Sequence, residues 1–164
     1  MEEQIGQPVF SQHHGFMQQA LAQAKIAAGQ DEVPVGVVIV HNDQIIAKAT
    51  NQVELLKDPT AHGEMIAITQ ASNALACKWL YECVMYVTIE PCSMCAGAIV
   101  LARMKRVYFG AGDPKAGACG SVINITQNNQ LNHRVEVSGG IFEEECGGLM
   151  SQFFEQKRQT KKSV

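Results

Sequence analysis

The chain has 164 residues, 46% of them hydrophobic and 18% charged, which are ordinary values for one globular domain with a single core. No stretch is apolar over the roughly 20 residues that a membrane-spanning helix needs, and the acidic start differs from a secretory signal, so we expect a cytoplasmic protein with no membrane partner. The formal net charge of −3 divides into +3 in residues 155–164 and −6 in the rest, which argues against a broad basic surface for nucleic acid.

The first half of the chain predicts a helix, a β-hairpin and a second helix. Apolar residues recur at steps of three and four before Gly29, and a run of β-branched residues follows. A polar turn then precedes a second apolar run, and Thr60 at the end of a loop can cap the next helix. The predicted bounds are helix 10–28, strand 35–40, turn 41–44, a return strand from 45, loop 51–61 and helix 62–75.

The second half alternates strands and helices, so neighbouring strands there should be parallel with helices packed on the sheet, and the hairpin should add an antiparallel edge. The predicted bounds are strand 84–89, helix 92–102, strand 105–110, loop 111–133, strand 134–137 and helix 141–158. We predict an α/β fold and one domain over residues 1–164, with flexible ends at about 1–9 and 159–164.

Six cysteines in a cytoplasmic chain should be reduced, so the close pair Cys92 and Cys95 indicates metal binding or redox chemistry rather than a disulfide. The other four have no partner at this spacing, and we expect most of them to be small buried thiols. They are Cys77, Cys83, Cys119 and Cys146.

His62, Cys92 and Cys95 form a candidate metal site. The cysteines stand three positions apart where a helix is predicted to begin, so both sulfurs can reach one ion, and the positive helix end favours thiolates. Thiolates with one imidazole select zinc among the common ions. Three protein ligands leave a position for water, as in catalytic rather than structural zinc sites. We expect one Zn²⁺ per subunit.

Glu64 stands two residues after His62, close to the metal but free to act as the catalytic proton carrier. It can take a proton from a metal-activated water and return it to the substrate. The pattern H-x-E followed by P-C-x-x-C is the known signature of zinc nucleobase deaminases.

Two simpler interpretations explain only part of this pattern. A thioredoxin-like pair accounts for the cysteines but leaves both His62 and Glu64 without a role. A structural zinc site needs a fourth protein ligand. That ligand could come from one of three other cysteines, Cys77, Cys83 or Cys119.

Five segments extend the pattern beyond the metal motif: 32–36 (EVPVG), 58–64 (DPTAHGE), 90–98 (EPCSMCAGA), 106–110 (RVYFG) and 132–137 (NHRVEV). On these segments the chain resembles the bacterial tRNA-specific adenosine deaminases over nearly its whole length. Related deaminases share the first three segments, whereas 115–121 (KAGACGS), 132–134 (NHR) and 153–158 (FFEQKR) are typical of the tRNA branch.

The resemblance implies a three-layer α/β/α cytidine-deaminase-like fold with a mixed five-stranded sheet, and a homodimer. It implies conversion of adenosine to inosine at the wobble position of a tRNA anticodon loop. Water would add to C6 of the extruded adenine while Glu64 protonates N1 and then the leaving amine. Basic residues around 103–115 and 157–162 would contact the RNA.

The resemblance also implies substrate contacts. Asn51 would hold the base or its ribose, and Phe153 would pack beside the neighbouring nucleotides. The base pocket would be walled by Glu32, Val33, Pro34 and Ile89, and the flanking RNA backbone would meet Asp113 and Lys115. Asn51 can equally be a loop-forming side chain, Lys115 a solvated charge and Phe153 a core residue.

Gly63 stands where the family usually has alanine. We expect this difference to remove a methyl group near the base and to destabilise the first turn of the helix by up to about 1 kcal/mol.

Two other functions fit parts of the sequence. A deaminase of a free base or nucleoside, such as guanine or cytosine, would use the same zinc site and need no basic surface. A noncatalytic, zinc-stabilised subunit could bind RNA or a partner, but it would have no use for Glu64.

Overall fold

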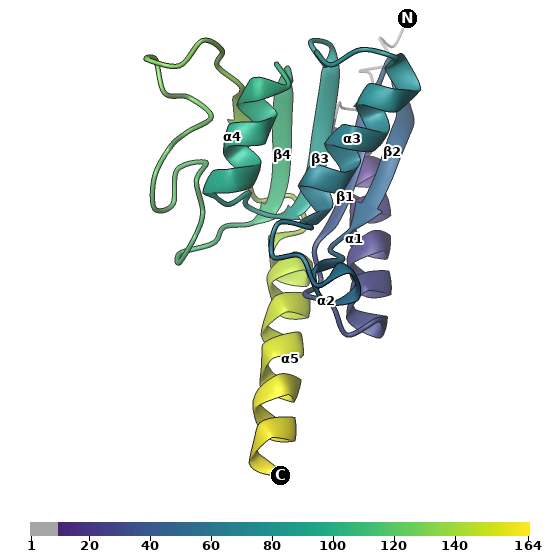
Figure 1. Ribbon diagram of the computed structural model, residues 1–164, viewed down its shortest axis with the longest axis vertical. Coiled ribbons are helices and arrows are strands. Elements are labelled where there is room, and N and C mark those ends of the chain that lie inside the picture. The colour runs from purple at the N-terminus through teal and green to yellow at the C-terminus, as the bar shows by residue number, and fades with distance from the viewer. Residues whose placement is uncertain (1–9) are drawn as a thin grey trace, which may run out of the picture.

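The computed structural model describes residues 10–164, and the segment 1–9, which we predicted to be flexible, lies outside the described residues. Five strands form one mixed sheet, with α1 and α5 on one face and α3 and α4 on the other (Figure 1). This is the three-layer α/β/α arrangement that the resemblance implied. None of the described helices has the length and apolarity that crossing a bilayer requires.

The sheet has the strand order β2-β1-β3-β4-β5. Strand β1 is antiparallel to both β2 and β3, whereas β3, β4 and β5 are parallel, as predicted for the second half of the chain. Asn42 and Asp43 both have positive φ in the hairpin turn, which suits the twist of the two strands it joins. The strands are β1 Gly36–His41, β2 Gln44–Thr50, β3 Cys83–Ile89, β4 Arg106–Ala111 and β5 Glu136–Ser138.

The helices are α1 Phe10–Gly29, α2 Val53–Leu56, α3 Gly63–Leu75, α4 Ser93–Leu101 and α5 Glu143–Lys162. Helix α2 lies inside the segment that we predicted to be a loop. It was not predicted because a single helical turn is too short for its apolar residues to show a period. Residues 159–162 are helical, although we predicted a flexible end there. The lysines of the last turn favour this extension because they complement the helix dipole.

The start of α3 differs from the prediction. His62, not Thr60, is the residue at the N-cap position, and its side chain makes no capping hydrogen bond. Thr60 instead donates from its amide and its hydroxyl to Asp58 Oδ1, at 2.8 and 2.7 Å. The prediction of Thr60 as the cap was therefore wrong, because this threonine belongs to the preceding turn.

Two glycines bring helices close to the sheet. A Cβ atom at Gly36 would collide with the backbone of α1 at Ala20, and one at Gly110 would collide with Cys146 of α5. Helices α1 and α5 therefore pack directly on β1 and β4. This close packing fixes the end of α1 and the body of α5 at the same end of the sheet, next to α2 (Figure 1).

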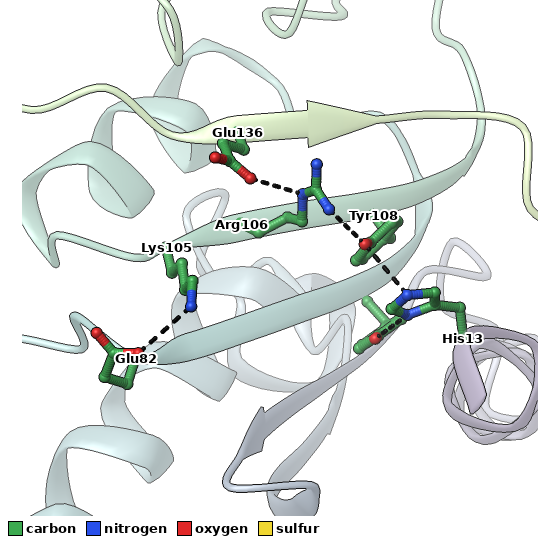
Figure 2. Close-up of polar contacts among 7 residues, drawn as sticks. His13, Glu82, Lys105, Arg106, Tyr108 and Glu136 are labelled. Carbon is green, nitrogen blue, oxygen red and sulfur yellow. Dashed lines mark hydrogen bonds and ion pairs between the residues drawn. The ribbon is translucent and has the colours of Figure 1, made fainter. Parts of the chain in front are cut away.

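A series of polar side-chain contacts crosses the sheet face that α1 covers (Figure 2). The Tyr86 hydroxyl lies 2.6 Å from Nδ1 of His13, and the Tyr108 hydroxyl lies 3.3 Å from Nε2 of the same ring. Arg106 donates to the Tyr108 hydroxyl at 2.7 Å and forms a 3.1 Å ion pair with Glu136. Four elements, α1, β3, β4 and β5, are thus joined through side chains.

The place of His13 in this series of contacts predicts that acid lowers the stability of the protein. Burial and the neighbouring Arg106 lower the pKa of His13 below its ordinary value of 6.5. The unfolded chain keeps the ordinary pKa and so binds more protons as the pH falls through 6.5, which lowers the free energy of unfolding. His13→Gln should therefore lose less Tm than the wild type between about pH 7.5 and pH 5.5 in thermal unfolding. His41→Gln removes a histidine outside this series of contacts and should lose as much Tm as the wild type. Equal losses of Tm in all three proteins would contradict the role of His13.

Candidate active site

The predicted metal donors converge where α3 and α4 begin. His62 and Cys92 occupy the N-cap positions of these helices in extended backbone conformations, and neither side chain caps its helix. Nδ1 of His62 lies 3.6 Å from Sγ of Cys92 and 3.5 Å from Sγ of Cys95. The three ligand atoms all lie within 4.8 Å of one another.

These distances suit a tetrahedral zinc ion. Zinc bonds of about 2.3 Å to sulfur and about 2.0 Å to nitrogen place those two atoms about 3.5 Å apart at a tetrahedral angle. The distances from His62 Nδ1 to the two cysteine sulfurs match this spacing. Within residues 10–164 the donor group contains these three side chains and no fourth, which is the open arrangement of a catalytic site.

The two thiols differ in acidity. A hydrogen bond from Cys95 and the backbone amides at the start of α4 lower the pKa of Cys92 to about 5, although burial opposes this shift. The pKa of Cys95 is raised because its thiol donates that bond and because it is buried. A metal ion must therefore displace the proton that Cys95 holds, as is usual when a thiol becomes a ligand.

Glu64 lies in the first turn of α3 beside these donors and is 3% exposed. Burial raises its pKa because the charged form is poorly solvated there. Its Oε2 atom has no hydrogen-bond partner among the described residues. A buried carboxyl group with a raised pKa and a free oxygen can accept and deliver a proton near neutral pH.

A cavity of about 630 Å³ opens beside His62, Glu64 and Cys92, and its size suits a nucleoside-sized ligand. Its walls include the following predicted substrate contacts: Glu32, Val33, Asn51, Ile89, Asp113 and Phe153. Lys115 lines an adjoining cavity of about 640 Å³, which shares Ile89 and Asp113 with the first. Pro34 is buried and lines neither cavity.

Asn51 and Glu32 also hold the walls of this cavity in place. Asn51 Oδ1 accepts a hydrogen bond from the Gly63 amide at 2.7 Å and so caps α3 in place of the N-cap side chain. The Glu32 carboxylate accepts the amides of Glu54 at 3.1 Å and Leu55 at 2.7 Å, which fixes α2. The loop-forming interpretation of Asn51 is therefore compatible with its place at the cavity.

Comparison with known proteins agrees with this geometry. A family model for MafB19-like deaminases matches residues 11–158. The tRNA-specific adenosine deaminase of Bacillus subtilis (strain 168) is 46% identical over 149 residues, which cover 91% of this chain and 92% of the relative. The chain belongs to the tRNA-specific adenosine deaminase family.

Solved structures of other deaminases share the fold of this chain. A structure from a study of A-to-I editing by tRNA:A34 deaminases at the wobble position of transfer RNA has a TM-score of 0.80 at 41% identity, over 82% of this chain and 98% of that chain. A guanine deaminase from Bacillus subtilis has a TM-score of 0.58 at 39% identity, over 61% of this chain and 64% of its own. The similarity to the first structure extends over more of both chains.

The structure corrects the expectation about Gly63. A Cβ atom at this position would lie 3.1 Å from Val37 and 3.3 Å from the backbone of Thr50, so it would face the sheet. Gly63 does not line the cavity. An alanine at this position would therefore crowd β1 and β2, and its methyl group would not face the cavity.

Sequence reasoning gave no role to Glu90, a 2% exposed residue that lines the cavity. Its Oε2 accepts the amides of Cys119 and Ser121, both at 3.2 Å, and the Ser121 hydroxyl donates to Oε1. A Cβ atom at Gly117 would collide with this carboxylate. Glu90 therefore holds the loop 113–121 against the cavity. An acidic residue between a buried strand and Pro91 was the available signal.

Several apolar residues of the cavity wall were also missed, among them Val53, Met150 and Phe154. Helix α5 supplies the last two. Their positions depend on how α5 packs across the sheet, which local sequence patterns do not specify.

Proposed function

We propose that this chain is a zinc-dependent hydrolase that converts adenosine to inosine at the wobble position of a tRNA anticodon, acting in the cytoplasm as a homodimer with one zinc ion per subunit. One observation carries the chemistry: the buried Glu64, with a free carboxylate oxygen, lies beside three zinc-type donors at a cavity. The family membership supports the substrate.

Different residues of the chain have different roles in the reaction. Zinc, when held by His62, Cys92 and Cys95, would supply Lewis-acid activation of a water molecule. Glu64 takes a proton from the attacking water and delivers it to N1 of the adenine while C6 becomes tetrahedral. Glu64 then carries a proton to the departing amine, so adenosine and water become inosine and ammonia. Asn51 lies on the cavity wall, where its side chain can orient the base or ribose.

The surroundings of the cavity support an RNA substrate. Helix α5 places the aromatic rings of Phe153 and Phe154 together with Lys157 and Lys161 on the cavity wall. The adjoining cavity adds the basic residues Lys115 and Arg158. Aromatic faces stack on unpaired bases and basic side chains contact phosphates, so this wall suits a single-stranded loop. Four basic residues line the two cavities although the net charge of the chain is −3, and they are Lys115, Lys157, Arg158 and Lys161.

The outer face of α4 supports a homodimer. This helix carries no charged side chain, and Leu101 on it is 78% exposed. A Cβ atom at Gly97 would meet open space. A helix that is apolar all round is normally covered, and a second copy of the chain offers a matching small-residue face. Light scattering should therefore give twice the mass of one chain.

One assay tests the proposed substrate. The protein should release ammonia from an anticodon stem-loop with adenosine at the wobble position and convert that base to inosine, as measured by the mass of the product. The same stem-loop with adenosine only at another loop position is the matched control. Guanine, cytosine and cytidine should give little or no ammonia.

Two outcomes would overturn the proposal. Turnover of guanine or another free base without turnover of the stem-loop would favour the free-base deaminase, whose fold is also similar. Zinc-loaded protein that binds the stem-loop without releasing ammonia would favour the noncatalytic subunit.

A further inference from the structure

One ion pair joins the part of α5 beyond residue 153 to the rest of the domain. Lys157 Nζ lies 2.6 Å from Asp31 Oδ2, and these residues are 126 positions apart in the sequence. The lower part of α5 projects beyond the sheet (Figure 1). Among the described residues beyond 153, Lys157 is the one whose side chain forms a polar contact outside α5 and its cap.

The pair lies at the cavity and not in the core. Asp31 and Lys157 both line the cavity that holds Glu64, and Lys157 also lines the adjoining one. Their side chains are 75% and 41% exposed, so the pair adds little to stability, typically about 0–1 kcal/mol. A contact of this kind at a substrate cavity has more effect on binding than on folding.

We propose that Asp31 is a specificity-determining residue that competes with an RNA phosphate for Lys157. This inference rests on the proposed function. In the free protein the Asp31 carboxylate occupies Lys157, whose ammonium group also lies 5.5 Å from the Phe153 ring. A phosphate of the bound loop needs the same ammonium group and must displace the carboxylate. Asp31 therefore weakens the binding of polyanionic substrates and has no such effect on an uncharged nucleoside.

Asp31→Asn isolates this effect. Asp31 has a φ of 61°, in the left-handed region that asparagine also tolerates, so the substitution removes the charge and keeps the backbone. Binding is measured by fluorescence anisotropy with the inosine-containing product stem-loop, which cannot be turned over. Asp31→Asn should bind this RNA about two- to fivefold more tightly at low salt. The slope of log affinity against log salt should steepen by up to about 0.7.

Two controls separate this role from a general charge effect. Glu144→Gln removes the same charge from an exposed position in the first turn of α5 that lines neither cavity. It should leave RNA affinity unchanged. In a Lys157→Gln background, Asp31→Asn should no longer change the affinity or the salt slope.

Three results would overturn the role of Asp31: unchanged affinity in Asp31→Asn, an equal gain in Glu144→Gln, or a gain that persists without Lys157. If wild-type protein deaminates the stem-loop and one of these results is found, only this inference fails. If wild-type protein neither binds nor deaminates the stem-loop, the proposed function fails and the role of Asp31 fails with it.

Discussion

Glu64→Gln should lower the turnover number for a wobble-adenosine stem-loop by about 10²–10⁴-fold while the protein keeps its zinc. Glutamine has nearly the same size as glutamate, so it fits the buried position in the first turn of α3. It cannot carry the proton from water to N1 of the base or on to the amine. The metal donors are His62, Cys92 and Cys95, and the substitution leaves all three in place.

Turnover is measured by ammonia release, and zinc by elemental analysis of the dialysed protein. Thermal unfolding should show no loss of Tm, because removing a carboxyl group that is poorly solvated in its buried position does not destabilise the fold. Glu144→Gln, an exposed change in the first turn of α5, is the matched control and should keep full activity. Unchanged turnover in Glu64→Gln would mean that another group carries the proton.

The chemistry of the site could be predicted from the sequence because residue identity and local spacing define it. Cys92 and Cys95 stand three positions apart at a helix start, so any helix beginning there brings both sulfurs to one side. His62 and Glu64 meet them because α3 and α4 both begin at one end of the sheet, where β3 ends. The alternation of strands and helices after residue 84 predicted the parallel strands there, whereas the meeting of α3 with α4 is a finding of the structure.

Other features depend on packing between segments that are distant in the sequence. The Glu90 contacts to the loop 113–121 and the Asp31 pair with Lys157 join positions whose local patterns carry no sign of each other. The direction of a Cβ atom at Gly63 depends on how α3 is rotated against β1, and this is why its expected place beside the base was wrong. Sequence patterns identify such residues as buried or charged, and the fold decides what they contact.

Cys92→Ser should abolish both zinc binding and deamination, whereas Cys77→Ser should change neither. Cys92 is half-buried at the start of α4 and its low pKa favours the thiolate that a zinc ion needs. A serine hydroxyl is a much weaker ligand and leaves two protein donors, too few to hold the ion. Cys77 is exposed and lies outside the donor group, so it controls for the loss of a thiol.

The cysteine variants also separate metal loss from unfolding. The core of the domain lies on both faces of the sheet and does not include Cys92, so Cys92→Ser should keep its secondary structure by circular dichroism. Its Tm should fall to that of wild-type protein stripped of zinc by a chelator, because both lose the stabilisation that bound metal adds. Zinc should restore activity to the stripped wild type and not to the variant. Full zinc content and turnover in Cys92→Ser would exclude this cysteine from the site.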